Sequence, residues 1–267
     1  MNLVEICKET ERIARETGLF IAAERKKFSQ SNVIQKGERD LVSYVDVTAE
    51  KLIVEGLQQL LPEAGFITEE KTVKDSGASL RWIIDPLDGT TNFIHGIPLF
   101  AVSIALQQDD DLLIGVVYEV NLDECFSAYK GGGAFMNGRK LSVTDTPLLR
   151  NALCATGFPY SSFPHVDRYF NTLRYLFQNS HGIRRLGSAA VDLAYVACGR
   201  IDAFFEYNLN AWDVAGGALI VQEAGGSVTD FSGGSNFVFG KELIASNKLV
   251  HAEFLASILH PPERLPS

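Results

Sequence analysis

Two aspartates stand close together in the segment WIIDPLDGTTNF, residues 82–93. Asp85 and Asp88 are three positions apart and follow the apolar run 82–84, so we expect them at the carboxyl end of a buried strand, where open α/β folds bind ligands. Two carboxylates about 5 Å apart repel each other by roughly 3 kcal/mol at an effective dielectric constant of about 20, so a cation should lie between them. Oxygen ligands without a nearby cysteine or histidine favour Mg²⁺. The pair therefore predicts a magnesium site.

The residues that follow this pair suit an anion. Gly89, Thr90 and Thr91 offer backbone N–H groups at an expected helix start, which is a favourable place for a phosphate group. A metal and a phosphate side by side indicate phosphoryl chemistry. The alternative is a polar turn whose aspartates only cap the following helix.

Further acidic residues stand at the edges of expected elements. Glu69 and Glu70 follow the short apolar run in FITEEK, Asp213 in AWDVAGG stands at a helix start, and Asp46 in SYVDVT lies near another. Each of them has a second interpretation as a turn or cap residue, and Asp46 has the context of an N-cap. If they instead converge with the aspartate pair, they complete a metal site.

The elements that must position these residues differ between the two halves of the chain. In the first half, apolar periodicity predicts a helix over the first 25 or so residues and a second one whose apolar stripe runs from Ala49 to Leu60, with Asp46 near its start. Short polar connections between strand-like runs predict an antiparallel meander with strands at 99–107, 112–120 and 124–131. Glycines at 131–133 and the pair Asn137-Gly138 mark further turns.

In the second half, strands and helices alternate, which predicts a layered α/β fold. The expected strands are 152–158, 182–187, 200–208, 228–230 and 243–246, and the expected helices are 165–178, 188–199, 212–226 and a last one from residue 248. We expect residues 1–267 to form a single domain, with a candidate subdomain boundary at 145–151.

Composition excludes several classes of partner. The 267 residues can bury a large core, and 46% hydrophobic with 21% charged residues is typical of a globular protein. The net charge of −9 argues against nucleic acids and anionic membranes, because both need concentrated Lys and Arg. Four scattered cysteines favour a reduced, cytoplasmic setting, and the charged N-terminal segment does not predict a signal peptide. No apolar run approaches the ~20 residues of a membrane span, and the histidines are not spaced as zinc ligands.

Two long segments carry a family resemblance. DPLDGTTNFIHGIP (85–98) and WDVAGGALIVQEAGG (212–226) resemble the signature motifs of the inositol monophosphatase family, which are Mg²⁺-dependent, lithium-sensitive phosphomonoesterases. FITEE and the segment 187–206 are also similar to that family, so the resemblance covers nearly the whole chain. It implies a layered αβαβα sandwich of the inositol monophosphatase and fructose-1,6-bisphosphatase type, usually assembled as a homodimer.

The resemblance also implies roles for individual residues. A water activated by Mg²⁺ attacks the phosphate directly, without a phosphoenzyme. By similarity, the Mg²⁺ ligands are Glu69, Asp85, the carbonyl of Leu87, Asp88 and Asp213. The catalytic residues are Glu69 and Thr90, which orient the water, with Asp46 as a supporting partner. Substrate contacts fall on Gly89, Thr90, Gly187, Ser188, Ala189, Glu206 and Asp213.

The implied substrate is a small phosphorylated polyol, first of all myo-inositol monophosphate. Glu206 matches the family carboxylate that accepts hydrogen bonds from inositol hydroxyls. The same carboxylate would suit the ammonium of histidinol phosphate, and a sugar bisphosphate is a third alternative. If Glu206 is only a surface acid at a strand end, it says nothing about the substrate.

Two other classes fit the residues less well. Haloacid dehalogenase-type phosphatases also end a strand on an aspartate-rich turn, but they place a nucleophilic aspartate in an Asp-x-Asp pair near the N-terminus. Here two residues separate Asp85 from Asp88. A non-catalytic binding protein is not indicated either, because Thr90 and every carboxylate that the metal needs are present.

Overall fold

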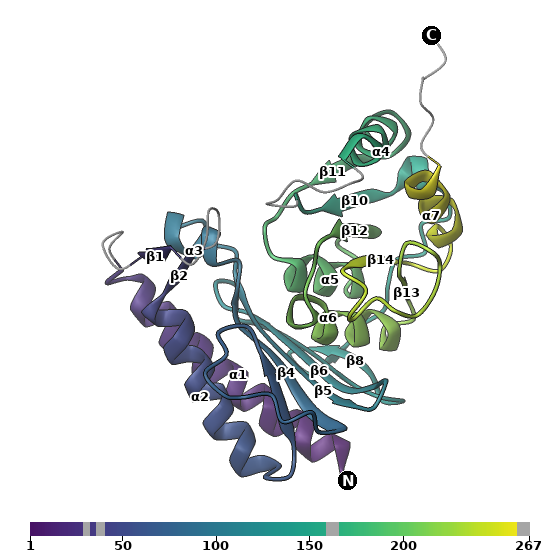
Figure 1. Cartoon of the computed structure of the whole chain (residues 1–267). Helices are drawn as coiled ribbons and strands as arrows, with labels where there is room; N and C mark the ends of the chain where they lie inside the picture. Colours follow the sequence, from purple (N-terminus) through teal and green to yellow (C-terminus); the bar gives the residue numbers. More distant parts are fainter. Residues whose placement is uncertain (29–32, 36–40, 159–165, 261–267) are drawn as a thin grey trace.

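The computed structural model describes residues 1–28, 33–35, 41–158 and 166–260. In this part of the chain, helices and sheets alternate in five layers (Figure 1). Two central helices separate a seven-stranded sheet from a five-stranded one, and an outer pair of helices covers the far face of each sheet. The predicted αβαβα sandwich is therefore confirmed. The helical layers are α1 (Leu3–Arg25) with α2 (Tyr44–Leu60), α5 (Ala189–Ala197) with α6 (Ala211–Glu223), and α4 (Val166–Asn179) with α7 (His251–Leu259).

The seven-stranded sheet comes from the first half of the chain, and its strands lie in sequence order. The first two strands run parallel, and all later neighbours are antiparallel. The predicted meander is confirmed in the third to fifth strands. The sequence predicts only turns for the last two, because both are short and lie next to glycines. The strands are β3 (Gly65–Thr68), β4 (Leu80–Asp88), β5 (Ala101–Gln108), β6 (Asp111–Glu119), β7 (Glu124–Tyr129), β8 (Gly133–Met136) and β9 (Arg139–Lys140).

The five-stranded sheet comes from the second half and has the order β11-β10-β12-β14-β13. Its middle strand β12 pairs in parallel with β10 and antiparallel with β14. The strands are β10 (Leu153–Thr156), β11 (Gly182–Arg184), β12 (Ala203–Tyr207), β13 (Ser227–Thr229) and β14 (Glu242–Ser246). A separate antiparallel pair, β1 (Val33–Gln35) and β2 (Leu41–Ser43), precedes α2.

The second predicted helix is confirmed as α2, which begins at Tyr44 after the N-cap Ser43, whose hydroxyl accepts from the Val45 amide, and Asp46 lies in its first turn as expected. Two predicted boundaries are wrong. The last helix, α7, begins at His251 and not at residue 248. β11 ends three residues early, at Arg184, because Gly187 has a φ of +95° and turns the chain out of the sheet.

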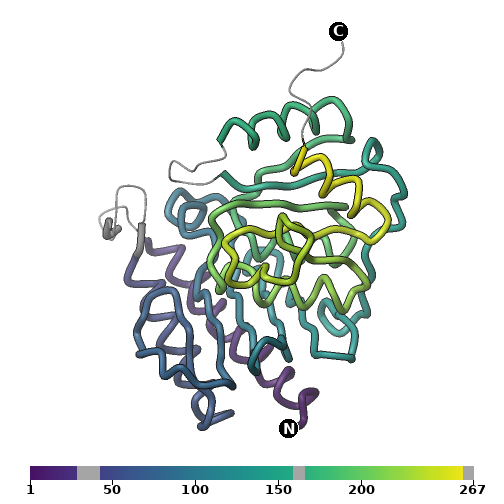
Figure 2. Tube along the Cα trace, turned by 45° about the vertical axis from the view of Figure 1, so that its right-hand side comes forward, coloured from purple at the N-terminus to yellow at the C-terminus, as the bar shows by residue number. Residues whose placement is uncertain are grey.

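Residues 141–152 carry the chain from one sheet to the other and include the short 3₁₀ helix η2 (Leu149–Asn151). The candidate boundary at 145–151 falls in this crossing and stays a prediction. Figure 2 shows the two halves, purple to teal and green to yellow, lying against each other. Among the helices of the described residues, none is both long enough and apolar enough to cross a membrane.

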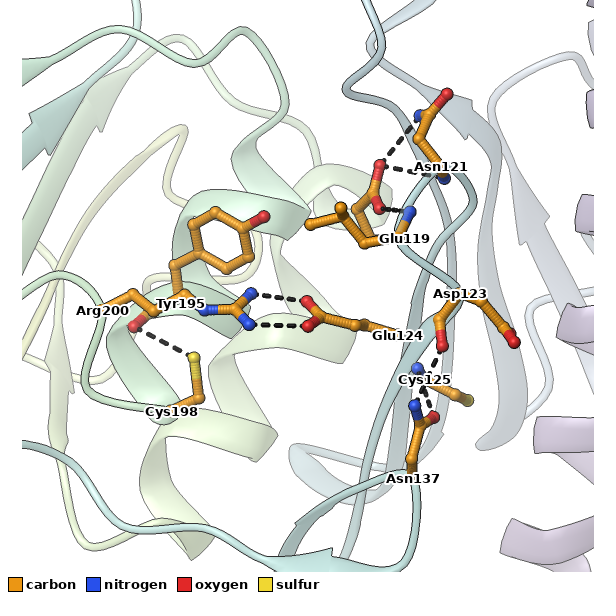
Figure 3. Close-up of polar contacts among 10 residues, drawn as sticks. Glu119, Asn121, Asp123, Glu124, Cys125, Asn137, Tyr195, Cys198 and Arg200 are labelled. Atoms are coloured by element: carbon orange, nitrogen blue, oxygen red, sulfur yellow. Dashed lines mark hydrogen bonds and ion pairs between the residues drawn. The ribbon is translucent and has the colours of Figure 1, made fainter.

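Helix α5, whose N-cap residue is Ser188, is anchored near its C-terminal end. Just after it, the Arg200 guanidinium donates two hydrogen bonds to the Glu124 carboxylate on β7, at 2.5 and 2.6 Å (Figure 3). The same guanidinium lies over the Tyr195 ring, 4.7 Å from its centroid. Arg200 therefore ties the C-terminal end of α5 to the first sheet.

Helix α6 approaches the first sheet at a pair of glycines. A Cβ atom on Gly115 of β6 would lie 2.4 Å from the backbone oxygen of Gly216 in α6. A Cβ atom on Gly216 would lie 3.1 Å from Ser103 Oγ and 3.2 Å from the Ile104 backbone oxygen. The backbones of helix and sheet are thus as close as two residues without side chains allow.

We expect Gly115→Ala to lower the stability, because its methyl group would collide with backbone rather than with a movable side chain. Overpacking of this kind costs about 1–3 kcal/mol. For a chain of this size, the melting temperature should fall by roughly 2–10 °C, measured by thermal unfolding. Gly56→Ala in α2 is the control, since its new methyl would contact only the Ile13 side chain, at 3.0 Å or more. An unchanged melting temperature for Gly115→Ala would contradict this packing.

Candidate active site

Four acidic residues of the predicted metal site lie at one edge of the first sheet. Glu69 directly follows β3, and Asp85 and Asp88 belong to the last residues of β4. Because β3 and β4 are parallel, their carboxyl ends meet, and the Glu69 amide continues the ladder by donating to the Ile84 carbonyl at 3.2 Å. Asp213 arrives from the first turn of α6, which packs against this sheet.

Three of these carboxylates accept hydrogen bonds from backbone or side-chain groups of the protein. Asp85 Oδ1 accepts from the Leu87 amide at 2.9 Å, and Asp213 Oδ2 accepts from the Asn210 amide at 2.6 Å. Asp88 Oδ2 accepts from Ser188 Oγ at 2.6 Å and from the amide at position 190 at 2.7 Å. Hydrogen bonds from the protein thus orient each of the three side chains.

The four carboxylates disfavour each other's charge. Burial, together with mutual repulsion, raises the pKa of Glu69 and of Asp85 well above their ordinary values. Burial raises the pKa of Asp88 to about 6, and burial with repulsion from Asp88 raises the pKa of Asp213 to about 7. Glu69 and Asp85 are close enough to share a hydrogen bond. A divalent cation would remove this repulsion, so the donor set fits Mg²⁺.

Among the described residues, no three His, Cys, Asp or Glu side chains are arranged as a group that could hold a metal ion. Glu69, Asp85, Asp88 and Asp213 are neighbours whose charges act on one another, and their role as Mg²⁺ ligands stays a prediction. The carbonyl of Leu87, also predicted as a ligand, lies between Asp85 and Asp88 in the chain.

Asp46 and Thr90 form a hydrogen-bonded pair beside this acidic edge. Asp46 is buried, and its Oδ2 accepts from the amide and the hydroxyl of Ser43, at 2.9 and 2.6 Å. Its Oδ1 faces Thr90 Oγ1 at 3.0 Å, and Thr90 Oγ1 also lies 2.9 Å from the Leu87 carbonyl. The prediction of Asp46 as an N-cap is wrong, because Ser43 is the N-cap and Asp46 is the third helical residue, which completes the capping box. Asp46 also contacts a predicted catalytic residue, and its role in a site stays a prediction.

The predicted phosphate turn is fixed from both halves of the chain. Gly89 has a φ of +94°, and a Cβ atom there would lie 3.1 Å from the Leu99 carbonyl and 3.4 Å from the Gly187 carbonyl. The Asn92 amide group donates to the carbonyls of Leu99 and Leu186, both at 2.9 Å. Gly187 is therefore brought beside the turn, as predicted for a substrate-binding residue.

Two neighbours of Gly187 that are also predicted substrate contacts have buried side chains, and their contacts with a substrate stay predictions. Ser188 is buried, caps α5 by accepting from the Val191 amide, and donates its proton to Asp88. Ala189 is also buried, at the first position of α5. Their side chains support the Asp88 carboxylate and the helix, which leaves Gly187 as the accessible member of the three.

Glu206 is not a surface acid. It is the penultimate residue of β12, it is partly buried, and burial with repulsion from Asp213 and Asp88 raises its pKa to about 8. Its carboxylate lies on the backbone of Gly157, where a Cβ atom would be only 1.9 Å from Oε1. Glycine at position 157 is therefore required for the observed position of Glu206.

Sequence reasoning missed four residues around this site, namely Asn92, Gly157, Arg185 and Asp192. Arg185 lowers the pKa of Glu206, Asp88 and Asp192 through its positive charge. In the sequence, Asn92 and Asp192 are ordinary polar residues of expected helices. Gly157 is a glycine near the end of an expected strand, and Arg185 is one of two adjacent arginines. Only the pairing of β10 with β12 places Gly157 beside Glu206, so no local signal marks it.

Four carboxylates at a strand end, next to a turn that can bind phosphate, in this layered fold are typical of a phosphatase. The sequence model of the inositol monophosphatase family matches residues 2–262. The chain belongs to the inositol monophosphatase family, and the family resemblance seen in the sequence is confirmed.

Several relatives are similar over nearly their whole length. The inositol-1-monophosphatase of Mesorhizobium japonicum is 41% identical over 249 residues, which cover 93% of this chain and 94% of that protein. The Nus factor SuhB of Escherichia coli is 41% identical over 92% of this chain and 93% of that protein. Among solved structures, the extragenic suppressor protein SuhB of Bartonella henselae has a TM-score of 0.89 and 41% identity, with 95% and 98% of the two chains covered. The Thermotoga maritima IMPase has a TM-score of 0.85 and 35% identity, with 95% and 96% covered.

The raised pKa values predict that Mg²⁺ stabilises the protein more at high pH. Asp88 and Asp213 have pKa values of about 6 and about 7 in the folded metal-free protein, above the ordinary value of 3.8. Their contribution to stability is complete below about pH 4 and is lost as the pH rises through about 6 to 7, because the folded state holds protons that the unfolded state releases. The melting temperature should therefore rise more on adding Mg²⁺ at pH 8 than at pH 5. Equal shifts at both pH values would contradict the coupling, and Asp85→Asn, which removes one repelling charge, should reduce the shift.

Proposed function

We propose that this chain is a Mg²⁺-dependent phosphomonoesterase that hydrolyses a small phosphorylated polyol, with myo-inositol monophosphate as the first candidate. The observation that carries the proposal is the acidic edge formed by Glu69, Asp85, Asp88 and Asp213 beside the hydrogen-bonded pair of Asp46 and Thr90. The family membership supports the reaction class. The relatives carry two different names, inositol-1-monophosphatase and Nus factor, so the choice of substrate rests on the residues of the site.

The acidic residues would hold the metal. Asp85, Asp88, Glu69 and Asp213 would contribute carboxylate oxygens, and Leu87 its carbonyl oxygen. When bound, Mg²⁺ supplies a Lewis acid for the phosphate oxygens and lowers the pKa of a coordinated water. The Ser188 hydroxyl keeps Asp88 in place at 2.6 Å, so the strand end does not depend on the metal for its orientation.

Thr90 and Asp46 would position the attacking water. A hydroxyl has one proton, so Thr90 Oγ1 donates either to Asp46 or to the Leu87 carbonyl. When it donates to Asp46, its lone pairs are free to accept from a water, and the Leu87 carbonyl is released for the metal. Burial raises the pKa of Asp46, which suits a carboxylate that takes up a proton passed through Thr90. No covalent intermediate is then needed, and we expect inversion of configuration at phosphorus.

Glu206 would contact the polyol. Its carboxylate lies near enough to Asp213 and Asp88 for their negative charges to raise its pKa. Histidinol phosphate and sugar bisphosphates are the alternative substrates of the same site. Inhibition by lithium and homodimer assembly stay predictions of the family resemblance, and a cytoplasmic location stays a prediction from the four scattered cysteines.

We expect hydrolysis of inositol 1-phosphate to stop in excess chelator and to return with Mg²⁺. Asp88→Asn and Asp213→Asn should each lower kcat/KM by roughly 100-fold or more, because the amide keeps the shape but loses the charge that holds the metal. Asp110→Asn is a matched control, as Asp110 is an exposed acid near the start of β6. Full activity of the wild-type chain in chelator would rule out the proposed function.

A second prediction tests the place of Glu206. We expect Gly157→Ala to fold, because its new methyl meets the movable end of the Glu206 side chain and not backbone. The displaced carboxylate should raise KM for inositol 1-phosphate by about tenfold, as Glu206→Gln should, since a charge-assisted hydrogen bond is weakened in both. Steady-state kinetics and a melting temperature within a few degrees of wild type check this. A Gly157→Ala enzyme with unchanged KM would show that Glu206 does not touch the substrate.

A further inference from the structure

Arg185 stands in the turn between β11 and α5, directly before the residues that hold Asp88. It is partly buried, whereas its neighbour Arg184 is exposed. Its guanidinium lies over Gly187, where a Cβ atom would be 2.4 Å from Nη1, and 5.7 Å from the centroid of the Phe158 ring. The positive charge is therefore fixed between the phosphate turn, which Gly187 borders, and the end of β10.

The acids around this arginine include the predicted substrate contact Glu206 and the predicted metal ligand Asp88. The charge of Arg185 lowers the pKa of Glu206 and Asp192 as well as that of Asp88. Asp192 on α5 is 1% exposed, and its Oδ1 has no hydrogen-bond partner among the described residues. A guanidinium is thus set among carboxylates in the region where Glu206 would meet the alcohol part of a phosphate ester.

This arrangement changes what Glu206 can select. A lone carboxylate would attract an ammonium group on the substrate. With a guanidinium near it, part of the attraction that Glu206 exerts on an incoming ammonium is cancelled, because the two positive charges repel each other. The cost of removing the ammonium from water is then only partly offset. A hydroxyl, in contrast, can donate to Glu206 and accept from Arg185, so both side chains contribute to its binding.

We infer that Arg185 is a specificity-determining residue of the proposed phosphatase site, which favours phosphate esters with uncharged hydroxyls over esters with an ammonium group. The inference rests on the proposed function and names its substrate class: polyol phosphates rather than amino-alcohol phosphates such as histidinol phosphate. The charge of Arg185 also lowers the pKa of Asp88, a predicted metal ligand. Removing Arg185 should therefore also change the turnover of every ester. The selectivity therefore has to be measured as a ratio between esters.

A matched pair of substrates isolates this ratio. Glycerol 1-phosphate and serinol phosphate differ only in a hydroxyl that is replaced by an ammonium group, and inositol 1-phosphate and histidinol phosphate provide a second pair. We expect Arg185→Gln to lower kcat/KM for glycerol 1-phosphate and inositol 1-phosphate by about tenfold. The ratio of serinol phosphate to glycerol 1-phosphate should rise by about tenfold or more, because Glu206 then acts alone.

Three further variants separate a specific role from a structural one. Arg185→Met removes the charge but keeps an apolar stem against Phe158, so it should change the ratio in the same direction even if Arg185→Gln folds poorly. Arg185→Lys keeps the charge and should leave the ratio within about threefold of wild type. Arg184→Gln is the matched control, since Arg184 is exposed and donates to the neighbouring Ile183 carbonyl at 3.0 Å, and its ratio should not change.

The outcomes distinguish the inference from the function on which it rests. A wild-type enzyme that hydrolyses the polyol esters, with a ratio unchanged in Arg185→Gln and Arg185→Met, overturns the role of Arg185 and leaves the proposed function intact. A wild-type enzyme that hydrolyses none of the four esters with Mg²⁺ overturns both. A raised ratio in the two charge-free variants, absent in Arg184→Gln, supports the inference.

Discussion

The structure depends on the burial of like charges at one sheet edge. Glu69, Asp85, Asp88 and Asp213 come from the ends of β3 and β4 and from α6, and repulsion within this group raises the pKa of Glu69, Asp85 and Asp213. Such an arrangement is unfavourable in a folded protein unless protons or a cation compensate it. The surrounding scaffold must therefore hold the carboxylates against their own repulsion, and much of the chain between the two sheets serves this purpose.

The main brace is helix α5, which connects the two halves at both of its ends. At its start, the Ser188 hydroxyl and the amide at position 190 hold Asp88, which belongs to the first sheet. Just after its end, Arg200 binds Glu124 on β7 of the same sheet. Helix α5 also packs into the core beneath the second sheet. It therefore fixes the position of Asp88, a predicted metal ligand of the first half, relative to Glu206, a predicted substrate contact of the second half.

The sequence predicts the parts of this site that lie in contiguous motifs. The spacing of Asp85 and Asp88 after an apolar run indicates a strand end, and a strand end is what β4 provides. The alternation of strands and helices predicts the layers, but five layers follow only from the family resemblance. Gly157 and Arg185 could not be predicted, because their roles come from strand pairing and from a turn that no local pattern encodes. Asp46 has the sequence context of an N-cap, but Ser43 takes that position, and neither the capping role of Asp46 at the third helical position nor its contact with Thr90 follows from the local pattern.

In the proposed site, the turn 185–190 would link metal binding to substrate choice, but through different residues. Ser188 and the amide at position 190 contact Asp88, and a change there would release a carboxylate that the other acids repel. Arg185 instead lies against Gly187 and the Phe158 ring, where a change would alter the charge and shape offered to a substrate. Glu206 stands on a separate strand and is positioned by Gly157, so it can also vary without moving a metal-type carboxylate. The chain thus separates residues that must keep the acidic edge together from residues that are free to set the substrate, and the second group is where differences in specificity should arise.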